Sequence, residues 1–182
     1  YFIKSEYNNK FDNYIVLSGG SGELEKHKRW TTNGYRELVK QILDNTDYNI
    51  IFVGSKGEQK IVDEILFNIE DEYLERITQL NGKTNLLELI GILRNSSLVV
   101  GNDNGVMHIA SACDANILGL FGSTDSKITG PIGNNIDIID HRIECAPCYA
   151  KDGNIEGCKD NVCMKNISSQ EVFKKIKENL YL

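Results

Sequence analysis

Short apolar runs alternate with longer amphipathic stretches along most of the chain. The runs are rich in β-branched residues and predict buried strands, at residues 14–17, 49–53, 76–80, 98–100, 117–121 and 136–139. The stretches between them place apolar residues at helical spacing, as Tyr35, Leu38 and Ile42 do, and a last helix is expected over about 169–180. This alternation is typical of an α/β protein.

The order of the predicted elements also predicts a topology. Six strands joined by right-handed crossovers most simply form a doubly wound, parallel, six-stranded Rossmann-like sheet of order 3-2-1-4-5-6. Strands 1 and 4 then lie side by side where the order reverses, and ligands of such sheets bind there. We therefore expect the loop after strand 1, residues 18–28, to face the loop after strand 4, residues 101–108, across a ligand cleft.

Length and net charge exclude several classes of protein. The 182 residues suit a single domain, and 20 Lys+Arg against 26 Asp+Glu give a net charge of −6. An acidic chain is a poor nucleic-acid binder, and no apolar run approaches the roughly 20 residues of a transmembrane segment. Because the chain starts at Tyr1 without a Met, we expect one nucleotide-binding domain, 1–182, of a longer protein. Residues 1–13 are the expected linker, 145–168 a Cys-rich loop and 169–182 the C-terminal helix.

The first loop carries glycines and then a basic cluster. Gly20 and Gly22 fit the first two positions of the dinucleotide pattern G-x-G-x-x-G, but Glu25 stands at the third, which argues against an NAD site. Residues 26–30, Lys-His-Lys-Arg-Trp, bring three fixed positive charges beside an aromatic ring. This stretch either binds a diphosphate or forms a solvated basic edge at the start of a helix.

The second loop leaves a buried strand and enters an apolar helix. Asp103 or Asn104 can cap that helix, and Gly105 lets the backbone approach a phosphate on its free N–H groups. Asn104 and His108 are four residues apart and share a face, while Asp103 could accept a hydrogen bond from a sugar hydroxyl. Simple capping and a structural histidine explain the same residues equally well.

Three further polar side chains are candidates at the same edge. Ser123 and Thr124 end the fifth strand and could contact phosphate or cap their loop. Glu58 follows the second strand, where a carboxylate binds ribose in such sheets, although helix starts also attract Glu. The chain has no Asp-x-Asp pair for a magnesium diphosphate, which favours chemistry without a metal.

Four of the five cysteines gather late in the chain. Cys145, Cys148, Cys158 and Cys163 are spaced C-x2-C-x9-C-x4-C, as in a four-thiolate structural zinc site. Buried reduced thiols, or disulfides formed after purification, are the alternatives. An odd count with Cys113 apart suits a reducing compartment, and no histidine pairing indicates a catalytic cysteine.

Taken together and in order, several segments resemble a known family. They are 28–30, 82–86, 102–110, 121–124, 130–131 and the Cys-x-Pro-Cys of 145–148 followed by Cys163-Met164. This set resembles the C-terminal half of glycosyltransferase family 9, the ADP-heptose:lipopolysaccharide heptosyltransferases. The resemblance implies a GT-B fold of two Rossmann-like domains, of which the N-terminal, acceptor-binding one is absent here, and an inverting transfer that requires no cofactor or catalytic metal.

The resemblance also implies roles for individual residues. Lys28 would pair with the donor diphosphate, and Thr84 would lie near the base. The full set of implied donor-binding residues is Gly19, Gly20, Lys28, Glu58, Thr84, Asp103, Asn104, Gly105, Val106, Met107 and His108. The family's catalytic base is an Asp of the N-terminal half, so no catalytic residue is expected in this chain, which alone would bind an ADP-sugar without efficient transfer to a lipopolysaccharide core acceptor.

The chain departs from the family's pattern in two places. Thr31 follows the tryptophan where the family usually has Pro, and the loop of residues 18–28 is longer and more charged. The ribose position aligns with Lys56 or Glu58, and the chemistry favours Glu58. The leading hypothesis is a donor-binding domain located in the cytoplasm, at the inner face of the bacterial inner membrane. A non-catalytic nucleotide-binding regulatory module and an NAD-dependent oxidoreductase domain are the alternatives.

Overall fold

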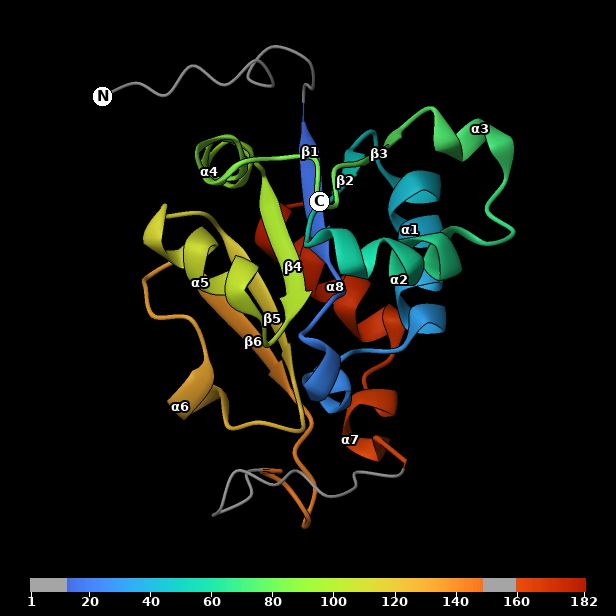
Figure 1. Ribbon diagram of the computed structural model, residues 1–182. Helices are drawn as coiled ribbons and strands as arrows, with labels where there is room; N and C mark the ends of the chain where they lie inside the picture. Colours follow the sequence, from blue (N-terminus) through green and yellow to red (C-terminus); the bar gives the residue numbers. More distant parts are fainter. Residues whose placement is uncertain (1–12, 149–159) are drawn as a thin grey trace.

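A parallel β-sheet forms the centre of the molecule, with helices on both faces (Figure 1). The computed structural model describes residues 13–148 and 160–182, apart from the side chain of Glu23. The strands are β1 (Tyr14–Ser18), β2 (Asn49–Phe52), β3 (Ile77–Gln79), β4 (Leu98–Asn102), β5 (Ile117–Phe121) and β6 (Ile136–Asp140). Their order is β3-β2-β1-β4-β5-β6, which confirms the predicted topology.

The longer helices divide between the two faces of the sheet. One face carries α1 (Thr32–Asn45), α2 (Gln59–Leu66) and α8 (Ser169–Leu180), and the other carries α4 (Leu86–Arg94) and α5 (Gly105–Ala112) (Figure 1). Short helical segments complete the described chain: η1 (Glu23–Lys28), η2 (Lys56–Glu58), α3 (Asp71–Leu74), α6 (Ser126–Thr129) and α7 (Val162–Lys165). No helix in this part of the chain has the length and apolar character that crossing a membrane requires.

Alternate side chains of the strands supply two cores. In β1, Ile15 and Leu17 pack with α1, α2 and α8, whereas Tyr14 and Val16 pack with α4 and α5. All of these side chains are buried, as expected for a parallel strand covered on both faces. The sheet is therefore a rigid platform whose carboxyl edge carries the loops.

Trp30 ties the end of the first loop to the C-terminal part of the chain. Its ring is buried against the edge of Tyr35, with centroids 4.8 Å apart. Its indole N–H donates to the carbonyl of Ile167 at 2.9 Å. The aromatic residue of the basic stretch thus has a structural role, and it fixes where the preceding residues of that stretch lie.

Candidate functional site: a cleft at the carboxyl edge of the sheet

A cleft of about 510 Å³ lies at the carboxyl ends of the central strands. Its walls come from the loops after β1, β2 and β4 and from the first turns of α4 and α5. The lining residues are Ser18, Ser21, Gly22, Glu25, Gly54, Ser55, Gly57, Glu58, Thr84, Asn85, Leu86, Leu89, Asn104, Gly105, Val106 and Ile109. The cleft is where the switch in strand order predicted it.

The loops after β1 and β4 face each other and are joined by hydrogen bonds. The side-chain amide of Asn102 donates to the carbonyl of Gly20 at 2.8 Å, and that of Asn104 donates to the same carbonyl at 3.0 Å. Asn104 also donates to the hydroxyl of Ser18 at 3.1 Å. The predicted juxtaposition of the two loops is confirmed, and these bonds hold its geometry.

Asn104 is the cap of α5. Its side-chain oxygen accepts from the backbone N–H groups of Val106 at 2.9 Å and Met107 at 3.4 Å. Two of the N–H groups expected to hold a phosphate are therefore already bonded to the cap. Gly105 still fits a close approach, because a Cβ at this position would meet no atom within 4 Å.

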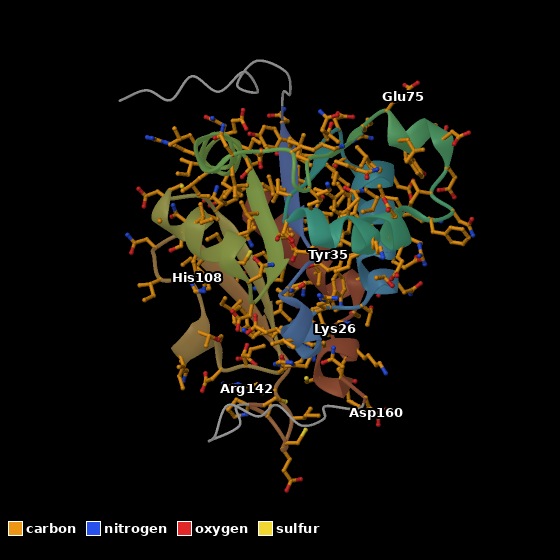
Figure 2. The ribbon with its side chains drawn as sticks, in the orientation of Figure 1. Lys26, Tyr35, Glu75, His108, Arg142 and Asp160 are labelled. Atoms are coloured by element: carbon orange, nitrogen blue, oxygen red, sulfur yellow. The ribbon has the colours of Figure 1, made fainter. Side chains whose placement is uncertain are left out.

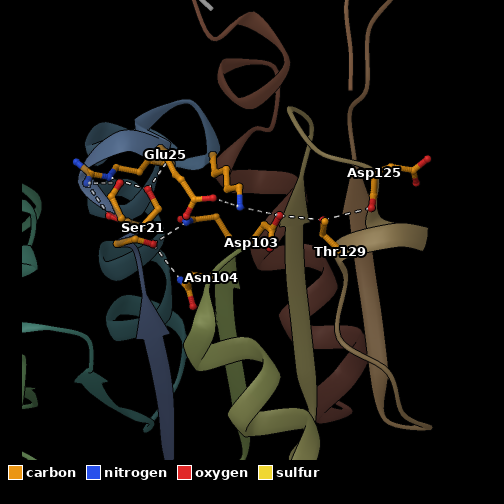
Figure 3. Close-up of polar contacts among 11 residues, drawn as sticks. Ser21, Glu25, Asp103, Asn104, Asp125 and Thr129 are labelled. Atoms are coloured by element: carbon orange, nitrogen blue, oxygen red, sulfur yellow. Dashed lines mark hydrogen bonds and ion pairs between the residues drawn. The ribbon is translucent and has the colours of Figure 1, made fainter. Parts of the chain in front are cut away.

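Asp103, the other candidate cap, is buried and engaged elsewhere. Its Oδ2 accepts from the hydroxyl of Thr129 in α6 at 2.9 Å and lies 3.4 Å from the ammonium of Lys28 (Figure 3). The residue is 4% exposed. In the structure Asp103 pairs with the Lys28 ammonium, and it does not line the cleft.

Lys28 lies between two carboxylates. Its ammonium is 2.5 Å from Oε1 of Glu25, in addition to the contact with Asp103. The pKa of Lys28 is raised: burial favours the neutral amine, but the hydrogen bond to Glu25 and the charges of both carboxylates outweigh that effect. Lys28 is therefore a charged lysine next to Glu25, which lines the cleft, while Lys28 itself lies outside the lining.

Arg29 holds the first loop together. Its guanidinium donates to the carbonyl of Ser21 at 2.7 Å and to the Ser21 hydroxyl at 3.0 Å. That hydroxyl donates in turn to the carbonyl of Glu25 at 2.8 Å. The basic stretch is thus neither a uniform phosphate-binding cluster nor a solvated edge, because Lys28, Arg29 and Trp30 each have a different role.

Glu58 closes the cleft beside the first loop. Its Oε2 accepts from the backbone N–H of Ser55 at 2.5 Å, which fixes the carboxylate at the start of η2. Its other oxygen lies so close to Gly20 that a Cβ there would fall 1.8 Å away. A side chain at position 20 would therefore displace the Glu58 carboxylate, and Gly19 lies against the ring of Tyr35.

The structure brings only part of the predicted donor site to the surface of the cleft. The predicted residues that line it are Glu58, Thr84, Asn104, Gly105 and Val106. Those that lie outside its lining are Gly19, Gly20, Lys28, Asp103 and Met107, and Met107 is 1% exposed. His108 lies on the α5 side of the molecule, away from Lys26 (Figure 2), and lines a second groove of about 460 Å³ between α4 and α5.

Ser123 and Thr124, which were candidates for phosphate contacts, are each 1% exposed. The carbonyl of Ser123 accepts from the backbone N–H of Cys148 at 2.7 Å. Ser123 therefore contacts the segment that follows β6, and both residues lie outside the lining of the cleft.

The apolar wall of the cleft was not predicted. It consists of Leu86 and Leu89 from α4 and of Val106 and Ile109 from α5. Leu86, at the start of α4, is 59% exposed although its side chain is apolar. A signal was present in the topology, because the first turn of a helix that follows a strand of such a sheet lies at the ligand-binding edge.

The cysteines give only part of the predicted zinc site. Cys145 is exposed, Cys148 is partly buried and Cys163 is buried in the core, whereas Cys158 lies outside the described residues. Among the described residues no group of three or more His, Cys, Asp or Glu side chains could hold a metal ion. The four-thiolate site stays a prediction.

Comparison with known proteins identifies the family. Residues 3–159 match glycosyltransferase family 9 (heptosyltransferase). The chain belongs to this family. Lipooligosaccharide heptosyltransferase 2 of Haemophilus influenzae is 32% identical over 135 residues, which cover 74% of this chain and 38% of that protein. Lipooligosaccharide heptosyltransferase 2 of Campylobacter jejuni (strain 81116) is 26% identical over 185 residues, which cover 97% of this chain and 57% of that protein.

A solved structure of the family shares the fold. The ADP-heptose lipopolysaccharide heptosyltransferase II of E. coli superimposes with a TM-score of 0.78 at 25% identity, over 93% of this chain and 46% of that one. This likeness confirms the predicted fold class, an α/β sheet corresponding to half of a GT-B glycosyltransferase. The chain spans about half the length, or less, of most of the family members that it matches.

Proposed function

We propose that this chain forms the nucleotide-sugar donor site of an inverting glycosyltransferase that moves a heptose, or a related sugar, from an ADP-sugar to a lipopolysaccharide core acceptor. The observation that carries the proposal is the cleft at the switch point of a family 9 sheet, with an apolar wall on one side and, on the other, Glu25 in contact with the Lys28 ammonium. Family membership counts against an NAD-dependent oxidoreductase and a regulatory module, neither of which is a heptosyltransferase. The E. coli relative is named for ADP-heptose, which is the reason for choosing that donor.

Each side of the cleft suits one part of an ADP-sugar. The apolar wall of Leu86, Leu89 and Ile109, with Thr84 nearby, suits the flat face of a base. The Glu58 carboxylate is an acceptor for ribose hydroxyls. Gly105 leaves open space for a phosphate at the start of α5, where the helix dipole favours negative charge.

The proposed chemistry requires the chain to stabilise a leaving diphosphate. As the glycosidic bond to the sugar breaks, negative charge develops on the diphosphate oxygen that leaves. The Lys28 ammonium and the start of α5 supply preorganised positive potential, which lowers the energy of that charge without a metal ion. A base in a preceding acceptor-binding domain would take the proton of the acceptor hydroxyl, and residues 1–13 would link the two domains. The location that we propose is the cytoplasmic face of the inner membrane.

The test is a comparison of ligands by titration calorimetry. ADP and ADP-heptose should bind, and NAD should bind most weakly. Lys28→Ala should weaken ADP binding about ten- to a hundredfold, since it removes a hydrogen bond to a charged group. Lys26→Ala, which removes the same charge from an exposed neighbour, is the matched control and should leave binding within about twofold.

Two results would contradict the proposal. Tight NAD binding without a response to ADP-heptose would favour the oxidoreductase, and binding of ADP without ADP-heptose would favour the regulatory module. Melting temperatures of both variants show whether Lys28→Ala acts on binding or on the fold.

A further inference from the structure

The Lys28 ammonium is held by two carboxylates that differ in exposure and in distance. The Asp103 side chain is 5% exposed and lies 3.4 Å from the ammonium. The Glu25 side chain is 43% exposed and lies 2.5 Å away. Each balances the same positive charge, but Glu25 is much more open to solvent than Asp103.

Asp103 is the permanent partner of Lys28. The hydroxyl of Thr129 donates to the Asp103 carboxylate on the side of α6, so the carboxylate is bonded from two elements (Figure 3). It is buried and does not line the cleft. Of the two partners of Lys28, only Glu25 lines the cleft.

Glu25 is the exchangeable partner. Its side chain lines the cleft, and its second oxygen lies over Gly22, where a Cβ would be 3.4 Å away. Two hydrogen bonds fix the backbone of Glu25. Its N–H donates to the Gly22 carbonyl at 2.8 Å, and its carbonyl accepts from the Ser21 hydroxyl. The backbone anchors keep the carboxylate within reach of Lys28, while the half-exposed side chain is able to rotate away into solvent.

We propose that Glu25 is an internal counter-ion that occupies the position of the donor's diphosphate on Lys28 and is displaced when the donor binds. This proposal rests on the proposed function, since it assumes that an anionic ligand uses Lys28. Glu25 then sets a charge threshold for ligands: only a group with enough negative charge to displace the Glu25 carboxylate can bind Lys28. The residue balances the charge of Lys28 while the cleft is empty, at the expense of part of the donor's affinity.

The test is a set of affinities measured by calorimetry on the full chain, with ADP and adenosine as probes. Glu25→Gln keeps the size and polarity of the side chain but removes the competing charge, so ADP should bind about three- to tenfold more tightly. Adenosine has no phosphate and should bind the variant and the parent alike. Glu75→Gln removes the same charge at the far end of the molecule, after α3, and should change neither affinity (Figure 2).

A double-mutant cycle separates competition for Lys28 from a general effect of charge. In a Lys28→Ala background, Glu25→Gln should give no further gain for ADP, because the cation over which the two anions compete is gone. Melting temperatures establish that each variant is folded.

Each remaining outcome overturns the proposal. Equal or weaker ADP binding by Glu25→Gln in a folded variant would mean that Glu25 positions Lys28 and does not compete for it. An equal gain for adenosine, or a gain that persists without Lys28, would assign the effect elsewhere. If the parent binds ADP but Glu25→Gln changes nothing, the proposed function survives this failure; if no variant and no parent binds ADP, both fall.

Discussion

Residues 26–30 show how much the local surroundings decide what a side chain does. In the sequence they are one basic stretch beside an aromatic residue. In the structure Trp30 is buried in the core, Arg29 holds the loop and Lys28 is paired with Asp103. The sequence pattern placed these residues after a buried strand, at the edge of the sheet where the structure has its cleft, because glycines and charges after such a strand are visible in the order of residues. It could not divide the roles, because each depends on a partner 8 to 137 residues away, such as the Ile167 carbonyl that accepts from Trp30.

His27 should give folding stability a dependence on pH. Its pKa is lowered from 6.5, first by burial and then by the nearby charge of Lys28. The folded chain therefore takes up the proton at lower pH than the unfolded chain does. As the pH falls through about 6.5, the unfolded state gains protons first and stability declines, until the lowered pKa is reached.

Thermal unfolding at pH 7.5 and pH 5.5 checks this expectation. His27→Gln should reduce the loss of stability between the two conditions, since it removes the group with the depressed pKa. His108→Gln, at an exposed histidine of the second groove, is the matched control and should leave the difference in place. An unchanged difference in His27→Gln would show that another group is responsible.

At the level of elements, regular periodicity decided what could be predicted. The strands and the longer helices carry enough residues to show a period, and they lie close to where that period predicts them. The short segments α3, α6 and α7 were not predicted, because four residues cannot display a helical repeat. One of these, α6, reaches the candidate site through Thr129.

Thr129→Val should weaken the contact by which α6 holds Asp103, the buried partner of Lys28. The substitution keeps the shape of the side chain but removes the hydroxyl that donates to Asp103. The buried carboxylate then loses a hydrogen bond, which should lower the free energy of unfolding by about 1–3 kcal/mol and weaken ADP binding. Thr129→Ser keeps the hydroxyl and should retain most of both.

Urea unfolding and ADP titration of the two variants provide the measurement. The expected signature is a larger loss in the valine variant than in the serine variant. Both substitutions change the packing at position 129, but only valine removes the hydroxyl that donates to Asp103. Equal losses in both variants would assign the effect to packing, and α6 would then have no part in positioning Asp103.

For the molecule as a whole, topology was more predictable than the shape of the cleft. The order of strands follows from handedness rules that hold for any chain with this alternation of elements, and it places the loops of β1 and β4 together. The composition of the walls depends on side chains from several separate segments, among them Ser55, Leu86 and Ile109. No single stretch of sequence contains that information.

The cysteine-rich segment, residues 145–168, should support the fold without forming the nucleotide cleft. The cleft is lined by residues between Ser18 and Ile109, whereas Cys163 is buried among the core side chains beneath α1 and α8. Replacing Cys145, Cys148, Cys158 and Cys163 by Ser should therefore lower the melting temperature, in part because a hydroxyl enters the core at position 163. ADP binding should remain, because none of the three cysteines that the structure describes, Cys145, Cys148 and Cys163, lines the cleft.

Metal analysis and thiol counting on protein purified without chelator complete this prediction. One zinc ion per chain, with all five thiols titratable after the metal is removed, would establish the four-thiolate site. Five thiols without metal would establish reduced cysteines instead, and the predicted zinc would be wrong. In either case ADP titration of the four-serine variant decides the placement of the cleft. Complete loss of ADP binding in a variant that keeps the parental melting temperature would mean that the segment contributes directly to the donor site, because only a local change could then abolish binding while leaving the fold intact.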